Sequence, residues 1–338
     1  MTLRHLRNIC ISMTAAMSLT GCITEDFHEC PNEYELKIVF IRNMLNADAF
    51  ASQVKSVDVK VFDPDTHRLV YSCSEQGTPL ATGTYRMKLP VKPGAYDILC
   101  WGGMAEGQSF GYASPTAEII DNFNVVLNTD ADGISRERHN DLYHGLVRRV
   151  TFTDNNNIGS RDVQTAEISL TKNTNRINVM LHNLDGTELK DSDFSFRIIA
   201  RNAEMAYDNS LSAQRRVEYQ PWHISASAII EDETPSSKSA VQTALAAEFV
   251  TGRLLSDANS RLEVFRNTDG ERIIAVPLER NLLLFKGEFH SQLSDQEYLD
   301  REDDYNITFI LDEKNNWNKD VKIQINGWST LPIQTEEW

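Results

Sequence analysis

Short stretches in which apolar and polar residues alternate follow one another from residue 34 to residue 325. In Val57–Val61 every second residue is apolar, which is the period of a strand with one buried face. Turn residues such as Asp63–Asp65 and Lys92–Gly94 separate these stretches. The pattern predicts an all-β fold built from antiparallel sandwiches.

The predicted strands form two blocks. The first block contains Tyr34–Ile41, Val57–Val61, Arg68–Ser72, Tyr85–Val91, Tyr96–Trp101, Phe123–Leu127 and Leu146–Phe152. The second block contains Val163–Leu170, Arg176–His182, Phe194–Ala200, Val217–Trp222, Ala240–Phe249, Leu262–Phe265, Ile273–Val276, Tyr305–Leu311 and Val321–Ile325. Ile224–Thr234 is either another strand or part of a loop.

Little helix is expected. Asn46–Gln53 has the pattern of a short helix, and Ser294–Arg301 is the clearest helix in the chain. Ser294 is its predicted N-cap, with Glu297 as the capping-box partner three residues later.

A polar, turn-rich run, Asp154–Asn157 followed by Gly159, separates the two blocks. It is the best candidate for a domain boundary, because such gaps carry few contacts between compact units. The sequence therefore predicts an N-terminal β-sandwich domain over residues 34–156 and a C-terminal one over 157–338.

The N-terminus has the pattern of a bacterial lipoprotein signal. Arg4 and Arg7 precede the apolar run Ile9–Leu19, which is too short to span a bilayer. Small residues then lead to Gly21 and Cys22, so we expect residues 1–21 to be removed and Cys22 to carry lipid. Residues 22–33 form a short acidic linker. The alternative is an ordinary secretory peptide in which Cys22 has no special role.

Charge and cysteine content narrow the possible partners. The formal net charge is −16, and removal of residues 1–21, which hold two arginines and no acid, makes it −18. Such a surface argues against nucleic acid, which needs clustered Lys and Arg. Of the five cysteines, Cys30, Cys73 and Cys100 remain beside Cys22 after processing, so they form at most one disulfide. Cys100 lies in an apolar run and is expected in the core.

Motifs that would carry chemistry are incomplete or missing. Residues 128–133 resemble the start of a calcium loop, but His139 occupies the position of the required bidentate Glu. The cluster of His139, Asp141 and His144 fits no standard zinc spacing. No phosphate loop, nucleophile elbow or His-Glu-x-x-His motif occurs. We therefore assign no catalytic, cofactor or metal residues and expect a protein without enzymatic activity.

Two weaker possibilities remain at this stage. The abundant carboxylates neither reveal nor exclude a glycosidase-like pair. Tryptophans could form a sugar platform, but Trp101 and Trp222 are flanked by apolar residues and are expected in the core. Trp317, which lies among asparagines, has the most exposed setting of the three.

Several segments together resemble the FimB-type family of fimbrial anchor subunits, lipoproteins at the base of type V (Bacteroidia-type) fimbriae. Each segment is weak alone, but their order covers nearly the whole mature chain. The segments are Cys22 with Glu25–Phe27 and Cys30–Pro31, Val54–Asp63, Pro93–Tyr96 leading into Cys100–Gly103, Asp141–Gly145, Leu170–Ile177 and Ile325–Trp328.

The resemblance implies two tandem transthyretin-like β-sandwich domains that act as a lipid-anchored base for the fimbrial shaft. It also implies a place on the outer membrane facing outward, with a shaft subunit as protein partner through strand addition or edge contact. In related stalk subunits a proteinase removes an N-terminal strand, and the C-terminal strand of another subunit fills the groove. Because lipid ties the other end of an anchor, growth of the polymer would stop there.

Three other functions stay open: a tip or accessory fimbrial subunit, a surface adhesin that binds glycans, and a hydrolase with an unrecognised carboxylate pair. The sequence leaves open which strand makes the contact, whether the first strand is removed, and whether Cys30, Cys73 and Cys100 include a disulfide. The tail Ser329–Trp338 could donate a strand or close its own sheet.

Overall fold

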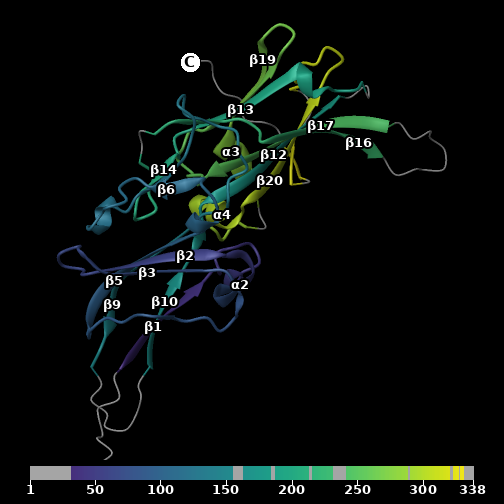
Figure 1. Cartoon of the computed structure of the whole chain (residues 1–338). Helices are drawn as coiled ribbons and strands as arrows, with labels where there is room; N and C mark the ends of the chain where they lie inside the picture. The colour runs from purple at the N-terminus through teal and green to yellow at the C-terminus, as the bar shows by residue number, and fades with distance from the viewer. Residues whose placement is uncertain are drawn as a thin grey trace, which may run out of the picture.

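The computed structural model describes residues 32–154, 163–183, 187–212, 215–230, 241–287, 290–319, 323–326 and 328–330. Within these ranges strands predominate, which confirms the all-β fold class with little helix. The strands form five sheets, arranged in two halves along the long axis of the molecule (Figure 1). The tandem transthyretin-like topology implied by the resemblance stays a prediction. No helix of the described residues is long and apolar enough to cross a membrane.

The N-terminal half contains two sheets. Sheet 1 has the order β10-β1-β4, with β1 at Glu33–Val39, β4 at Met87–Lys88 and β10 at Val163–Ser169. Sheet 2 has the order β11-β9-β5-β2-β3, with β2 at Ser56–Phe62, β3 at Leu69–Gln76, β5 at Gly94–Gly102, β9 at Tyr143–Phe152 and β11 at Thr171–Lys172. The two sheets enclose a core that includes Leu36, Val59, Ile98 and Ile168.

Strand β5 of sheet 2 is buried on both faces, which explains its continuous apolar run. Ile98 and Cys100 point into the core shared with sheet 1, whereas Leu99 and Trp101 belong to the larger core on the opposite side. A strand covered on both faces needs apolar residues at successive positions and not at alternate ones. The run therefore marks the place where the two cores meet.

The C-terminal half is a sandwich of two large sheets. Sheet 4 has the order β19-β18-β13-β15-β8, with β8 at Ile134–Ser135, β13 at Phe194–Ala200, β15 at Val217–Tyr219, β18 at Arg261–Arg266 and β19 at Glu271–Pro277. Sheet 5 has the order β16-β17-β12-β20-β21-β22, with β12 at Thr174–Asn183, β16 at His223–Ile230, β17 at Val241–Gly252, β20 at Asp304–Leu311, β21 at Ile323–Ile325 and β22 at Trp328–Thr330. Ile198 and Val264 face Val179 and Leu245 across the core.

Smaller elements complete the two halves. Sheet 3 has the order β14-β7-β6, with β6 at Phe110–Tyr112, β7 at Val125–Leu127 and β14 at Glu204–Met205. The α helices are α2 (Phe50–Gln53), α3 (Leu278–Leu283) and α4 (Asp295–Arg301). Short 3-10 helices lie at Thr78–Ala81, Met104–Glu106, Ile120–Asn122 and Asp191–Asp193. Helix α4 lies close to the junction of the halves (Figure 1).

Strand pairing does not change at the predicted boundary. β10 pairs in parallel with β1 from Val163 to Ser169, and β11 pairs with β9, so both belong to the N-terminal sheets. In return, β8 pairs with β15, and β7 pairs with β14 of the C-terminal part. The division into domains at 34–156 and 157–338 stays a prediction, and the pairing favours a boundary nearer residue 173.

Several local predictions differ from the structure in extent. Tyr85–Val91 forms only the two-residue β4, and the helix expected at Asn46–Gln53 is restricted to α2. β16 resolves the ambiguity at Ile224–Thr234 in favour of a strand as far as Ile230, beyond which the described residues stop. The six-residue helix α3 was not predicted.

The predicted helix cap is confirmed in part. The Ser294 hydroxyl accepts a hydrogen bond from the Glu297 backbone N–H at 3.1 Å, as an N-cap should. The Glu297 carboxylate, however, pairs with Arg301 at 2.8 Å. The capping box is therefore only half formed, because Arg301 provides a stronger charged partner for the carboxylate.

Gly103 lies in a position that excludes any side chain. It has a φ of +87°, and an added Cβ would lie 1.8 Å from the carbonyl oxygen of Asp141. We expect Gly103→Ala to lower the free energy of unfolding by about 2 kcal/mol or more, from backbone strain and steric displacement together. Gly111→Ala is the matched control, since its Cβ would meet nothing within 4 Å. Urea denaturation measures both, and equal losses for the two variants would contradict this interpretation.

Candidate functional site

The predicted lipid site lies outside the described residues, together with Gly21, Cys22 and Cys30. The two cysteines among the described residues, Cys73 and Cys100, are both free. Val59 of β2 pairs with Cys73 on one side and with Cys100 on the other, so a whole strand separates the two thiols. Cys100 is fully buried, as predicted, and burial raises the pKa of its thiol. Neither thiol has the exposed, electropositive setting of a reactive cysteine.

The three residues considered as possible metal ligands, His139, Asp141 and His144, each have a separate interaction partner. His139 Nε2 lies 2.5 Å from the Ser135 hydroxyl, and His144 Nε2 lies 2.8 Å from the Tyr207 carbonyl oxygen. The Asp141 carboxylate faces the Lys172 ammonium at 3.2 Å. Among the described residues, no three His, Cys, Asp or Glu side chains come together in a way that could hold a metal ion.

The loop that resembles a calcium site is an ordinary turn. The Asp130 carboxylate accepts hydrogen bonds from the backbone N–H groups of Asp132 and Ile134 and also pairs with Arg136 at 2.6 Å. These hydrogen bonds favour the ionised carboxylate and hold the Asp130 pKa below its ordinary value. Its oxygens therefore stabilise the loop that leads into β8.

The two buried histidines should make the protein sensitive to mild acid. Burial lowers the pKa of both His139 and His144 from 6.5 to about 4, so both are neutral in the folded state at pH 5. The unfolded chain binds these protons below about pH 6.5, so stability falls as the pH drops from 6.5 toward 4. We expect a loss of about 1–2 kcal/mol per histidine between pH 7 and pH 5, measured by urea denaturation.

A variant separates this effect from the general acid response. His144→Gln removes one titrating group, so its unfolding free energy should fall less between pH 7 and pH 5 than that of the unmodified protein, whatever its absolute stability. His67→Gln is the control, because the His67 side chain is 44% exposed. An unchanged pH dependence in His144→Gln would refute the assignment.

The tryptophans are arranged differently from the prediction. Trp101 is fully buried, as expected, and donates from Nε1 to the Phe123 carbonyl oxygen at 3.2 Å. Trp317 was predicted to have the most exposed setting of the three, but it is only 7% exposed, and its ring meets that of Phe309 edge to face. Trp222 is half-buried, with the Arg138 guanidinium 5.2 Å from its ring centre and His223 stacked beside it.

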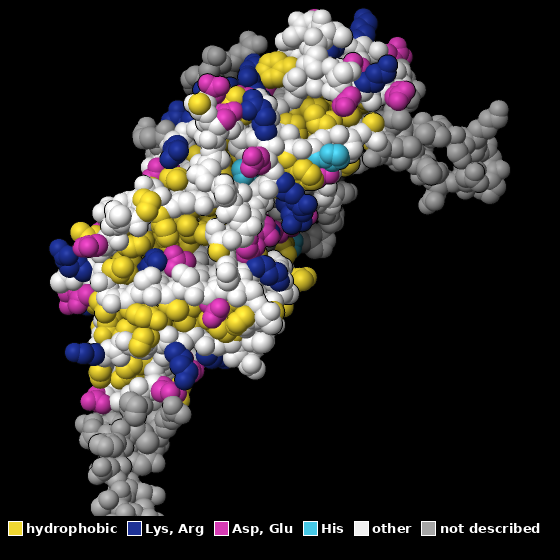
Figure 2. All heavy atoms as spheres, viewed as in Figure 1, with side chains coloured by type: hydrophobic (Ala, Val, Ile, Leu, Met, Phe, Trp, Pro, Cys, Tyr) yellow, Lys and Arg dark blue, Asp and Glu magenta, His cyan; other side chains and the backbone are white. Residues whose placement is uncertain are grey.

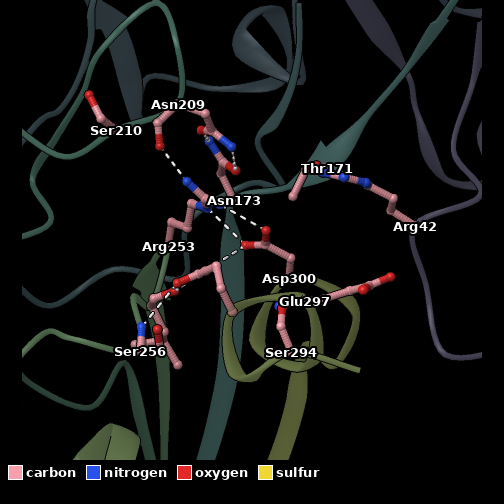
Figure 3. Close-up of polar contacts among 12 residues, drawn as sticks. Arg42, Thr171, Asn173, Asn209, Ser210, Arg253, Ser256, Ser294, Glu297 and Asp300 are labelled. Carbon is pink, nitrogen blue, oxygen red and sulfur yellow. Dashed lines mark hydrogen bonds and ion pairs between the residues drawn. The ribbon is translucent and has the colours of Figure 1, made fainter. Parts of the chain in front are cut away.

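A buried polar network surrounds α4 at the junction between the two halves (Figure 3). The Arg253 guanidinium forms two hydrogen bonds to the Asp300 carboxylate, at 2.9 and 2.8 Å. The two side chains are only 12% and 8% exposed. Arg253 also donates to the backbone carbonyl oxygen of Asn209. Such a bidentate pair fixes both distance and angle between the elements that carry it.

Amide side chains extend this network. Asn173 and Asn209 exchange two hydrogen bonds between their side-chain amides, at 2.5 and 3.2 Å (Figure 3). Both residues are buried, and Asn173 lies between β11 and β12, where the chain passes from the N-terminal sheets to sheet 5. The amide pair therefore connects the crossover segment to the end of β17 through Arg253.

Two further contacts join the halves directly. The buried Lys172 ammonium lies 3.2 Å from Asp141, on the N-terminal side, and 2.5 Å from Asp303, just before β20. The Arg301 guanidinium of α4 donates to the Asn43 carbonyl oxygen and to the Asn46 side chain, in the loop after β1. These bonds restrict bending between the halves.

A polar pocket of about 430 Å³ lies beside this ion bridge. Its wall contains the carboxylates of Asp141, Asp303 and Asp304. Because Lys172 contacts two of them, an ammonium occupies the space that a substrate atom would need between paired catalytic acids. The arrangement is that of a structural ion bridge.

No sequence motif identifies the network residues as a functional group, because Arg253 and Asp300 are 47 positions apart. The segments that resemble the fimbrial anchor family did include some of these junction residues. Lys172 and Asn173 lie inside Leu170–Ile177, one of the segments that carry the resemblance, and Asp141 begins another.

Comparisons with known proteins agree with this architecture. The model of the family described as fimbrillin-A associated anchor proteins Mfa1 and Mfa2 matches residues 27–331. A crystal structure of a candidate adhesin from Bacteroides thetaiotaomicron is 29% identical, with a TM-score of 0.77 over 89% of this chain and 98% of that chain. A candidate polysaccharide-binding protein from the same organism is 27% identical, with a TM-score of 0.74 over 90% and 99%.

The fold is also shared with the fimbrial anchor protein Mfa2 from Porphyromonas gingivalis. That structure has a TM-score of 0.66 and 16% identity, over 90% of this chain and the whole of the other. No curated protein matches the chain. The family match covers most of the sequence and confirms the resemblance to fimbrial anchor subunits. The chain is a cell-surface fimbrial protein that belongs to the family of fimbrillin-A associated anchor proteins Mfa1 and Mfa2.

Proposed function

We propose that this protein is the base subunit of a fimbria, held in the outer membrane by lipid on Cys22 and attached through its folded body to the first shaft subunit. The observation that carries the proposal is the anchor-family match, which begins at residue 27, just after Cys22. The eleven peptide links between Cys22 and Glu33 span at most about 40 Å, so β1 stays near the membrane. The role is structural and requires no catalytic residues, cofactor or metal.

Attachment at one end accounts for a limit on growth. A subunit tied to the membrane by several acyl chains, at about 0.8 kcal/mol per buried methylene, is held almost permanently. Only its other end can receive a subunit, so polymerisation terminates there. The base subunit would thereby set the length of the fimbria.

Strand β3 supports contact with the shaft through a strand edge. It pairs only with β2 among the described strands, which leaves the outer edge from Val70 to Gln76 without a strand partner. It contains neither lysine nor proline, the residues that commonly protect exposed edges. Main-chain hydrogen bonds along such an edge would provide affinity, and alternate side chains would provide specificity.

Deletion of the gene tests the proposal against a tip or accessory role. Cells without the base subunit should release long fimbriae into the medium, as seen by electron microscopy and by immunoblots of the culture supernatant. A tip subunit would leave shafts attached to the cell. Attached fimbriae of normal length in the deletion strain would exclude the base function.

A glycan-binding role has less support among the described residues. One structural relative is described as a candidate polysaccharide-binding protein, and such proteins commonly use exposed aromatic platforms. Every Trp and Tyr whose side chain is described here is buried or half-buried. Trp222, the most accessible tryptophan among them, already has Arg138 and His223 against its ring.

A further inference from the structure

Strands β1 and β10 lie side by side at the end of the molecule away from sheets 4 and 5 (Figure 1). They pair in parallel, from Glu33 opposite Val163 to Val39 opposite Ser169, with seven residue pairs in register. On its other side β1 has only two paired residues, in the short strand β4. Among the described strands, β10 is therefore the main neighbour that holds β1 in its sheet.

Side chains hold this pair in one register. Leu36 and Ile38 of β1 and Ile168 of β10 are buried in the same core. Figure 2 shows basic and acidic side chains at the surface of this end of the molecule, where Lys37 pairs with Glu167 at 2.7 Å. A slip of β1 by one residue would turn its buried side chains outward and bring charged ones into the core. Stepwise sliding is therefore unfavourable, and β1 leaves its place only when the pairing is lost as a whole.

The parallel direction of the pair determines how it responds to tension. The chain enters β1 at Glu33, at one end of the pair, and leaves β10 at Ser169, at the opposite end, to pass through β11 into β12 of the C-terminal half. Tension between these two points slides the strands past one another and loads all their hydrogen bonds together. In an antiparallel pair the two points would lie at the same end, so the bonds would open one after another. Bonds that are loaded together share the force, so the pair resists a larger force before it separates.

We propose that the pair of β1 and β10 is a mechanical clamp, which keeps β1 in the fold when tension acts on the N-terminus of the mature chain. The inference rests on the proposed base function, because lipid on Cys22 would apply that tension. Eleven peptide links join Cys22 to Glu33, so tension from the membrane reaches the described structure first at β1. The bonds to β10 then transmit the force to the rest of the fold.

Two pulling geometries on the same chain distinguish sliding from peeling. One handle is attached to a tag at the N-terminus of the mature chain, and the other to a single introduced cysteine. Val163→Cys places the second handle on an exposed residue at the N-terminal end of β10, opposite Glu33, so pulling peels the pair apart from one end. Thr268→Cys places it in the exposed turn between β18 and β19, at the opposite end of the molecule, so pulling slides β1 along β10 (Figure 1).

Both proteins carry alanine at Cys22, Cys30 and Cys73, so that only the introduced cysteine reacts, and Cys100 stays because it is fully buried. We expect single-molecule force spectroscopy at one loading rate to give a rupture force at least about twofold higher for sliding than for peeling. Equal rupture forces in the two geometries would overturn the proposal.

A matched pair of variants at Lys37 assigns the resistance to β1. The Val39 carbonyl oxygen accepts a hydrogen bond from the Leu170 backbone N–H, directly after β10. Backbone groups two residues apart in a strand point to the same side, so the N–H of Lys37 also faces β10. Lys37→Pro removes this donor, whereas Lys37→Thr keeps it and removes only the surface ion pair with Glu167.

In the sliding geometry Lys37→Pro should lower the rupture force by about a third or more, and Lys37→Thr should change it by less than about a tenth. Circular dichroism establishes that each variant is folded. The comparison of the two geometries needs neither variant, so it tests the clamp even if Lys37→Pro does not fold. Equal rupture forces for the two folded variants would place the resistance outside the pair and refute the clamp.

These measurements use neither lipid nor shaft, so the clamp and the base function can fail separately. Fimbriae released from the deletion strain, together with equal forces for sliding and peeling, would exclude the clamp alone. Fimbriae that stay attached in that strain, together with a higher force for sliding, would exclude the base function alone. A higher sliding force that Lys37→Pro lowers and Lys37→Thr preserves would support the clamp.

Discussion

Replacing Cys22 with alanine should detach fimbriae from the cells while the subunit itself still folds. The thioether cannot form on alanine, so the acyl chains that hold the mature chain in the membrane are lost. The first described strand, β1, begins at Glu33, so the substitution changes no residue of the described core. We expect most fimbriae in the culture medium, counted by electron microscopy and by immunoblots of cells and supernatant.

Controls separate the lipid from other causes of release. Cys100→Ala changes a free thiol in β5, away from the strand edge proposed for shaft contact, and should leave attachment unchanged. Mass spectrometry of the mature N-terminus should find acyl groups in the parent protein and none in Cys22→Ala. Normal attachment in the Cys22→Ala strain, with the protein expressed at parent levels, would disprove the lipid-anchor role even if the protein remains a fimbrial subunit.

The fold class could be predicted because each strand has its own alternation of apolar and polar residues in the sequence. Phe194–Ala200 was predicted with the bounds it has in the structure, since its alternation of buried and exposed residues is complete within seven positions. Which strand pairs with which cannot be predicted from such a local pattern. β10 joins β1 across about 130 residues, and nothing in either stretch specifies a partner, so the domain boundary was placed at the polar run before β10.

Trp317 shows how a local reading of polarity can fail. Its asparagine neighbours suggested an exposed loop, but Asn315 has a φ of +58° and turns the chain back on itself. The turn brings Trp317 opposite Leu311 and against Phe309, so the ring is covered by the strand that precedes the turn. Asparagine adopts this backbone region more readily than most residues, and here it marks a tight turn.

Some of the candidate functional residues could also be predicted from the sequence, and others could not. Gly21 and Cys22 could be chosen from the sequence because a processing signal is read along an extended chain. The junction network could not, because Arg253, Asp300 and Lys172 acquire their roles only when distant segments meet. Their burial removes charge from water, so each ion pair must be complete in the folded state.

The pair of Arg253 and Asp300 should therefore be the most sensitive polar contact of the junction. We expect Arg253→Met to lower the free energy of unfolding by about 3–5 kcal/mol, because it leaves a buried carboxylate without its cation. The double variant Arg253→Met with Asp300→Leu should recover much of that loss, since no unpaired charge remains. Arg68→Met breaks a pair with Glu118 whose side chains are 66% and 76% exposed, and should cost less than about 1 kcal/mol.

Urea denaturation of the four proteins gives these differences, and limited proteolysis reports whether the halves separate before the whole chain unfolds. If the junction carries load between membrane and shaft, Arg253→Met should also shed fimbriae under shear at a subunit level equal to that of Arg68→Met. Equal stability of Arg253→Met and Arg68→Met would show that the network does not hold the halves together. A double variant no more stable than Arg253→Met would show that lost packing and not the unpaired charge causes the effect.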